Sequence, residues 1–169
     1  ADAVAAMGIS YKIYMVPMQV SMGFSQGIMP LVSYNFASGD RKRMKASILF
    51  AIKLVVPALA VVTLLYYIGS GELISLFMKN ESIIAYGSRF LRGFSLGLAF
   101  LSLDFLTVGV FQSLGFGKYA LLFAVMRKLV LEIPALLILN AIFPLYGLAY
   151  AQFTAELILG VCAILMLRY

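Results

Sequence analysis

The sequence contains no histidine and only one cysteine among its 169 residues. Without histidine, the chain cannot assemble a Ser-His-Asp triad or a Cys/His zinc site. Cys162 lies in an apolar run and has no second cysteine with which to form a disulfide inside the chain. The sequence therefore predicts neither an enzyme nor a metal site, and it indicates no cofactor.

Charged residues are also scarce, at 12% of the chain, whereas hydrophobic residues make up 63% and the mean hydropathy is +1.02. A typical soluble domain has about 25% charged and about 45–50% apolar residues. This chain has too little polar surface to cover a core in water. We therefore expect an integral membrane protein. Its fold class should be all-α, because the apolar segments are continuous rather than alternating.

Hydrophobic segments long enough to cross a bilayer recur along the chain. A spanning helix needs about 20 mostly apolar residues. Five transmembrane helices are predicted, over residues 4–37, 46–69, 86–116, 120–142 and 145–167. The first of these is long enough to tilt or bend, and Pro17 and Pro30 are its expected bend sites.

The distribution of basic residues predicts how these helices are oriented. A cluster of basic residues follows the first helix, at Arg41, Lys42, Arg43 and Lys45. Cytoplasmic loops collect Lys and Arg, so we expect residues 40–45 in the cytoplasm and residues 70–82 on the opposite side. The net charge of +6 then reflects membrane topology. Because the cluster adjoins a membrane helix, no nucleic-acid partner is expected.

Three motifs occur in order along the chain. The first contains Gly23, Gln26-Gly27, Pro30, Tyr34-Asn35 and Ser38-Gly39, and the basic cluster follows it. The second contains Gly109, Gln112, Gly115 and Gly117. The third contains Arg127-Lys128, Pro134, Pro144, Gly147, Gln152 and Glu156. Together these motifs resemble helices eight, ten, and eleven to twelve of the multidrug and toxic compound extrusion (MATE) family.

The resemblance implies a twelve-helix antiporter that expels organic cations in exchange for Na⁺ or H⁺. In such a protein two six-helix lobes rock between outward-open and inward-open states. This chain would supply helices eight to twelve, which are most of the C-terminal lobe, and the N-terminal lobe and helix seven would lie outside it. The implied location is the plasma membrane, as a multi-pass protein of a bacterial inner membrane. The implied partners are the lipid bilayer, the missing lobe and small organic cations.

Polar residues within the apolar segments are the candidates for the substrate or cation pathway. A charge inside a membrane costs about 2.5–3.5 kcal/mol on insertion scales, and it usually faces the protein interior. Asp104 lies near the middle of its segment, so it is a candidate proton carrier or counter-charge for a cationic drug. An ion pair with Lys53 or another buried cation is the structural alternative. The other candidates are Gln26, Pro30, Asn35, Gln112 and Glu156.

Pro30 predicts a weakened helix in the first segment, because proline removes one backbone hydrogen bond. Unpaired backbone is tolerated at membrane depth only against protein or water. We therefore expect a broken helix beside a cavity and a hinge at Pro30, with Gly27 giving a neighbouring helix room. A plain packing kink is the alternative. Gln26 and Asn35 either bind a ligand or connect helices by hydrogen bonds.

Small residues and charges at helical spacing predict two kinds of local contact. Gly23-x-x-x-Gly27 and Gly93-x-x-x-Gly97 fit the spacing of surfaces where membrane helices approach closely. Lys128 and Glu132 are four residues apart, which predicts an ion pair along one helix.

Two other functions compete with drug export. One is a flippase for lipid-linked oligosaccharides from the same superfamily, which would need a strongly cationic cavity for pyrophosphate. The other is a truncated membrane module that transports nothing. The acidic character of Asp104 and Glu156, the mid-membrane charges placed most securely, favours the export of cations over the flippase.

Overall fold

Within residues 2–168, which the computed structural model describes (side chains to residue 165), the chain is helical and has no strand. The elements are α1 (Asp2–Ala37), α2 (Arg41–Ile68), α3 (Ser70–Ser75), α4 (Glu81–Ser95), α5 (Leu98–Ser113), α6 (Gly117–Val125), the π-helix η1 (Met126–Glu132), α7 (Ile133–Ile142) and α8 (Gly147–Arg168). The all-α expectation is confirmed.

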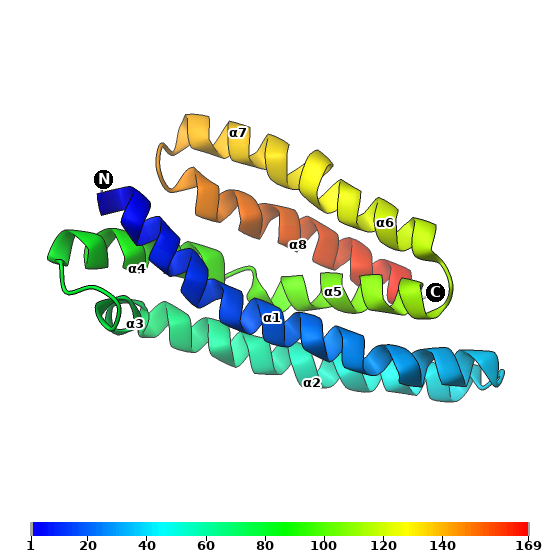
Figure 1. The fold of residues 1–169 in the computed structure, drawn as a ribbon. Coiled ribbons are helices and arrows are strands. Elements are labelled where there is room, and N and C mark those ends of the chain that lie inside the picture. The colour runs from blue at the N-terminus through cyan, green and yellow to red at the C-terminus, as the bar shows by residue number, and fades with distance from the viewer. Residues whose placement is uncertain (1, 169) are drawn as a thin grey trace.

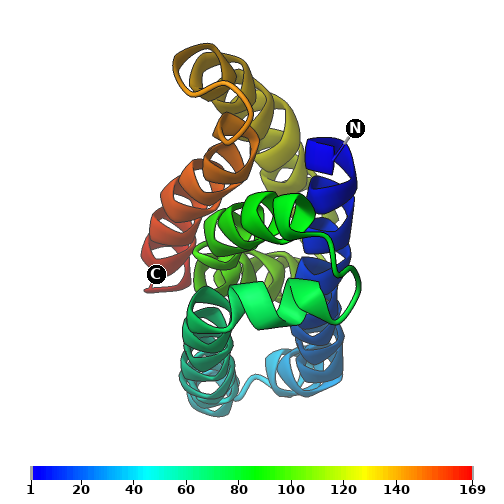
Figure 2. The same ribbon diagram turned by 90° about the vertical axis from the view of Figure 1, so that its left-hand side faces the viewer.

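The helices form a bundle in which α4 and α5 are central. Both central helices contact α1, α2 and α8. The α1–α2 hairpin lies on one side of them, and the hairpin made by α7 and α8 lies on the other (Figures 1 and 2). The main core cluster joins α1 and α2 to the central helices and includes Tyr14, Phe90, Phe94, Leu98 and Leu101.

The basic cluster forms the first turn of α2 rather than a loop. Helix α2 begins at Arg41, five residues earlier than the predicted start at residue 46. The reason is a helix cap: the Asp40 carboxylate accepts a hydrogen bond of 2.9 Å from the backbone N–H of Arg43. The turn from α1 is made by Gly39, whose φ of +78° lies in the left-handed region that glycine adopts easily.

One continuous helix was predicted over residues 86–116, and this prediction is wrong because the segment forms two helices. Helices α4 and α5 meet at an angle of 44° across a short break. At the break, Thr63 Oγ1 of α2 donates a hydrogen bond of 3.0 Å to the carbonyl oxygen of Ser95. Gly97 lies so close to α8 that a side-chain carbon there would overlap the Glu156 carboxylate. The bend therefore follows from contacts with other helices.

The segment predicted as one helix over residues 120–142 changes its geometry in the middle. Residues Met126–Glu132 are π-helical, and α7 begins just beyond them with Pro134 in its first turn. Proline has no N–H to donate to the preceding turn, and π-helical turns are frequent where the regular hydrogen-bond ladder is interrupted. The path of the chain continues in one direction through α6, η1 and α7 (Figure 1).

Among the described residues, α2 and α8 are each long and apolar enough to cross a membrane, and the bent pair of α4 and α5 qualifies if it counts as one span. Helix α1 has 36 residues but contains Gln19, Gln26 and several serines, which lower its hydropathy. The rod made by α6, η1 and α7 is divided by its π-helical part. By length and composition, two of the five predicted spans therefore meet the requirements for crossing a membrane, and a third does so if the bent pair counts as one span.

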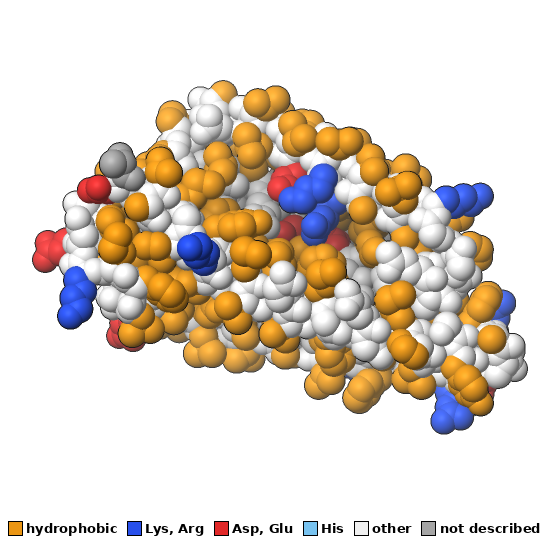
Figure 3. All heavy atoms as spheres, viewed as in Figure 1, with side chains coloured by type: hydrophobic (Ala, Val, Ile, Leu, Met, Phe, Trp, Pro, Cys, Tyr) orange, Lys and Arg blue, Asp and Glu red, His pale blue; other side chains and the backbone are white. Residues whose placement is uncertain are grey.

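The outer surface is largely hydrophobic. Large apolar side chains such as Leu49, Phe50, Leu64 and Leu65 of α2 are exposed. Figure 3 shows hydrophobic side chains over most of one face, with charged groups toward the ends and in a hollow near the middle. Contiguous apolar surface of this extent suits contact with lipid rather than water.

Candidate functional site

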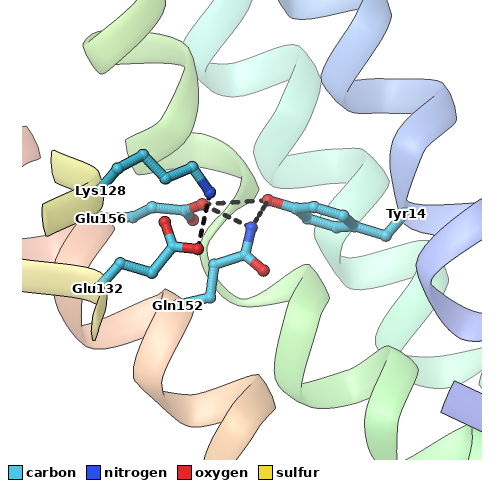
Figure 4. A network of polar contacts seen from close by, with 5 residues as sticks. All are labelled: Tyr14, Lys128, Glu132, Gln152 and Glu156. Atoms are coloured by element: carbon cyan, nitrogen blue, oxygen red, sulfur yellow. Dashed lines mark hydrogen bonds and ion pairs between the residues drawn. The ribbon is translucent and has the colours of Figure 1, made fainter. Parts of the chain in front are cut away.

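A cluster of polar side chains lies in the interior between α1 and α8. Tyr14 of α1 is fully buried, and Glu156 of α8 is 2% exposed. The Tyr14 hydroxyl donates to Glu156 Oε1 at 3.1 Å. Gln152 Nε2 donates to the same carboxylate oxygen at 3.0 Å and to the Tyr14 oxygen at 2.6 Å. The three side chains form a closed ring of hydrogen bonds that fixes one oxygen of the carboxylate (Figure 4).

Local geometry explains how these side chains meet. Gln152 and Glu156 are one helical turn apart on α8, so their side chains extend from the same face. Tyr14 is held by aromatic packing, with its ring centre 5.6 Å from that of Phe94 and 6.1 Å from that of Tyr11. The absence of a side chain at Gly97 gives the Glu156 carboxylate room beside the break between α4 and α5.

Asp104 of α5 is the second buried carboxylate, with 1% of its surface exposed. Within the part of the chain whose side chains are described, neither of its oxygens has a hydrogen-bond partner, and Glu156 Oε2 has none either. Because buried polar groups are normally paired, unpaired carboxylate oxygens of this kind are suited to binding a cation or carrying a proton.

The predicted alternative for Asp104, an ion pair with Lys53, is wrong. Lys53 is exposed on α2, and Asp104 accepts no contact from it. The basic groups near the buried carboxylates come instead from η1. The Arg127 guanidinium lies 5.3 Å from the centre of the Phe105 ring.

The predicted pair of Lys128 and Glu132 is confirmed. Lys128 Nζ lies 2.7 Å from Glu132 Oε1, and the two side chains are 55% and 23% exposed. Figure 4 places both beside Glu156. An exposed pair of this kind contributes little stability, so its main effect is on the charge around the buried cluster.

Four of the other predicted site residues lie away from this cluster. Gln26, Gly27 and Pro30 of α1 and Gln112 of α5 are all exposed in this chain. The proposed part of Gln26, Pro30 and Gln112 in a substrate pathway stays a prediction, as does the proposed part of Gly27 in a hinge. Asn35 is buried, and its amide donates to the carbonyl of Leu31 at 2.8 Å and to Ser47 Oγ at 3.4 Å. The bond to Leu31 lies within α1, and the bond to Ser47 connects α1 to α2, which fits the structural alternative for Asn35.

Helix α1 continues through both of its prolines, so the expected break at Pro30 is not found. No helix of this chain approaches Gly27, because nothing lies within 4 Å of a side-chain carbon placed there. The same holds at Gly23. In contrast, Gly93 packs against Ala149 of α8, where an added carbon would lie 2.6 Å from the alanine Cβ. Of the two glycine motifs, only Gly93-x-x-x-Gly97 is a helix contact here.

Two residues of the cluster, Tyr14 and Gln152, were not among the predicted site residues. Gln152 lies four residues before Glu156, and this spacing on one helix was the signal that could have identified it. Tyr14 is one of ten tyrosines and has no local feature that distinguishes it. Its role depends on a partner 142 positions away.

Replacing Tyr14 with phenylalanine is expected to lower the free energy of unfolding by about 1–3 kcal/mol, because a buried carboxylate oxygen loses one of its two donors. The measurement is thermal or denaturant unfolding of the whole transporter that contains this segment. Tyr11→Phe is the matched control, since Tyr11 is 42% exposed and packs beside Tyr14. An equal loss in both variants would show that the hydrogen bond to Glu156 is unimportant.

The comparisons with known proteins agree with the geometry. A sequence profile of the MatE family matches residues 1–138. The multidrug export protein MepA of Staphylococcus saprophyticus is 31% identical over 164 residues, which cover 97% of this chain and 36% of the relative. This chain therefore spans about a third of the length of the curated relatives that it matches.

Solved structures share the fold. A multidrug resistance MATE family transporter of the MOP superfamily matches in its outward-facing conformation with a TM-score of 0.91, over 99% of this chain and 38% of that one. A structure described as the inward-facing conformation of such a transporter matches with a TM-score of 0.86, over 94% of this chain and 37% of that one. Both are 18% identical to this chain in sequence, so the likeness establishes the arrangement of helices and nothing about ligands.

Proposed function

We propose, since this chain belongs to the MatE family, that it forms part of one lobe of a membrane transporter that exports drug-like organic cations. The curated relatives are multidrug export proteins and not enzymes. The observation that carries the proposal is the pair of buried carboxylates, Asp104 and Glu156, inside a bundle of this fold. Acidic groups in a low-dielectric interior favour cations as cargo.

The proposed mechanism is antiport against Na⁺ or H⁺ by alternating access. Among the described side chains, Asp104 has two unpaired oxygens and Glu156 has one, so each carboxylate can accept a coupling cation, a proton or a cationic substrate in turn. Arg127, whose guanidinium lies over the ring of Phe105 beside Asp104 in the chain, would weaken cation binding and help release. Pro30 of α1 remains the proposed hinge for the change of access.

The proposed setting is the plasma membrane, with residues 40–45 in the cytoplasm and a second lobe completing the transport path. The 36% coverage of MepA is consistent with a further lobe outside this chain. The flippase alternative receives less support, because both fully buried charged side chains among the described residues are acidic. Pyrophosphate would be repelled by them.

The direct test uses the whole transporter in everted membrane vesicles, with a fluorescent organic cation as the cargo. We expect uptake into the vesicles to require an imposed Na⁺ or H⁺ gradient and to stop when an ionophore collapses that gradient. Gradient-independent movement of a lipid-linked oligosaccharide would support the flippase. No movement of either cargo, with the protein folded and abundant, would support the inactive module.

A further inference from the structure

A groove of about 840 Å³ lies between α2, α4, α7 and α8, and neither Asp104 nor Glu156 lines it. Figure 2 looks onto this end of the bundle. None of the three side chains in the hydrogen-bonded ring of Tyr14, Gln152 and Glu156 lines the groove. Its polar and charged lining comes mainly from α4 and α8, and its apolar lining from α7 and the turn after it.

Two arginines of α4 give the groove its charge. Arg89 and Arg92 are three residues apart, so they lie on one face of the helix. Arg92 Nε donates to Ser70 Oγ at 2.9 Å and to the carbonyl of Tyr67 at 3.1 Å, which holds its guanidinium in place. Arg89 forms no ion pair or hydrogen bond with any described side chain. No acidic residue is found among the described residues that line the groove.

Aromatic rings lie under both guanidinium groups. Arg89 is 5.7 Å from the centre of the Tyr146 ring, and Arg92 is 5.4 Å from that of Tyr67. Tyrosine is enriched at the level where lipid headgroups meet the hydrocarbon, and both tyrosines lie at ends of long helices. An arginine packed on such a tyrosine is suited to meeting the charged headgroup of a lipid.

The apolar part of the groove suits a hydrocarbon chain. Leu139 and Ile142 of α7 and Phe143 after it contribute to the lining. A second hollow of about 300 Å³ shares Arg89 and Tyr146 with the groove and adds Ser82 and Tyr86. The molecule that fits this arrangement has one negative charge, an apolar chain on one side and a small polar group on the other.

We propose that this groove binds an anionic phospholipid. Its phosphate lies between Arg89 and Arg92, because the planar guanidinium fork matches phosphate oxygens. An acyl chain runs along Leu139, Ile142 and Phe143, and the polar headgroup occupies the hollow beside Ser82 and Tyr86. A free phosphate ion would match the arginines but gain nothing from the apolar lining. The inference is independent of what the transporter exports.

The test is binding of phosphatidylglycerol to the purified whole transporter in detergent, measured by native mass spectrometry over a lipid titration. Arg89→Gln is the principal variant, because Arg89 is exposed and forms no hydrogen bond or ion pair with a described side chain, so its loss should leave folding intact. We expect the dissociation constant for phosphatidylglycerol to rise about fivefold, as for the loss of one basic residue at an anionic membrane surface. Lys79→Gln is the matched control, since Lys79 is exposed nearby but does not line the groove.

A second variant separates the apolar contact from the charge. Thr154 of α8 lines the groove, and Thr154→Phe should fill it and weaken phosphatidylglycerol binding while both arginines remain. Phosphatidylcholine should bind more weakly than phosphatidylglycerol, and inorganic phosphate should not compete with the lipid. Equal binding to the parent, Arg89→Gln and Thr154→Phe would overturn the proposal. Competition by inorganic phosphate would replace it with a site for small anions.

Discussion

Asp104→Asn is expected to lower gradient-driven export of organic cations by at least about tenfold while the transporter remains abundant in the membrane. The substitution keeps the size of the side chain but removes the negative charge and the proton that the carboxyl group can carry. Losing one partner of a buried charge interaction costs several kcal/mol of binding free energy. Each 1.4 kcal/mol corresponds to a factor of about ten in affinity. Initial rates of cation transport in everted vesicles, corrected for abundance, measure the effect.

The same substitution should leave stability unchanged or raise it. Both Asp104 oxygens lack a hydrogen-bond partner among the described side chains, so no existing bond is broken, and the cost of burying a charge is removed. If Asp104 had a structural role in an ion pair, the substitution would instead lower stability, because breaking a buried ion pair typically costs about 3–5 kcal/mol. Glu72→Gln, at an exposed position of α3, is the control for loss of one acidic charge. Normal export by Asp104→Asn would remove Asp104 from the mechanism.

Gly97→Val should destabilise the bundle by about 2–4 kcal/mol, through overpacking and the loss of buried hydrogen bonds. A side-chain carbon at position 97 would overlap the Glu156 carboxylate and would lie 3.6 Å from the backbone Cα of Phe153. The Glu156 carboxylate would have to leave Tyr14 and Gln152, or the break between α4 and α5 would have to move away from α8. Unfolding of the purified whole transporter, followed by thermal aggregation or denaturant titration, measures the loss.

The control for this substitution is Gly71→Val, because nothing lies within 4 Å of a side-chain carbon at Gly71 in α3. That change should alter the unfolding free energy by no more than about 0.5 kcal/mol, as expected of an open position. Similar behaviour of the two valine variants would mean that Gly97 does not set the distance between α5 and α8.

The helical fold could be predicted from the sequence because its main signal is local. Each segment is apolar over enough consecutive residues to cross a bilayer, and alternation is absent. The ion pair of Lys128 and Glu132 was equally predictable, since both residues lie on one helix at a fixed spacing. Asp104 and Glu156 could be identified as buried because a charge in an apolar segment usually faces the protein interior.

The breaks in the helices could not be predicted in the same way. Pro30 weakens α1 locally, yet the helix continues through it, because removing one hydrogen bond does not decide the path of a helix packed on its neighbours. The real bend, between α4 and α5, depends on Thr63 of α2 and Glu156 of α8. Contacts between residues so far apart leave no periodic signal in the sequence, and the same is true of Tyr14.

The hydrogen bond between Tyr14 and Glu156 joins two residues that are synthesised at different times. The two residues are 142 positions apart, and a ribosome adds about 5–20 residues per second. Tyr14 is therefore synthesised about 7–28 s before its carboxylate partner. During that interval its hydroxyl must be satisfied by water, lipid headgroups or the insertion machinery. Nascent chains stalled before Gln152 should consequently hold α1 less firmly than chains released after Glu156.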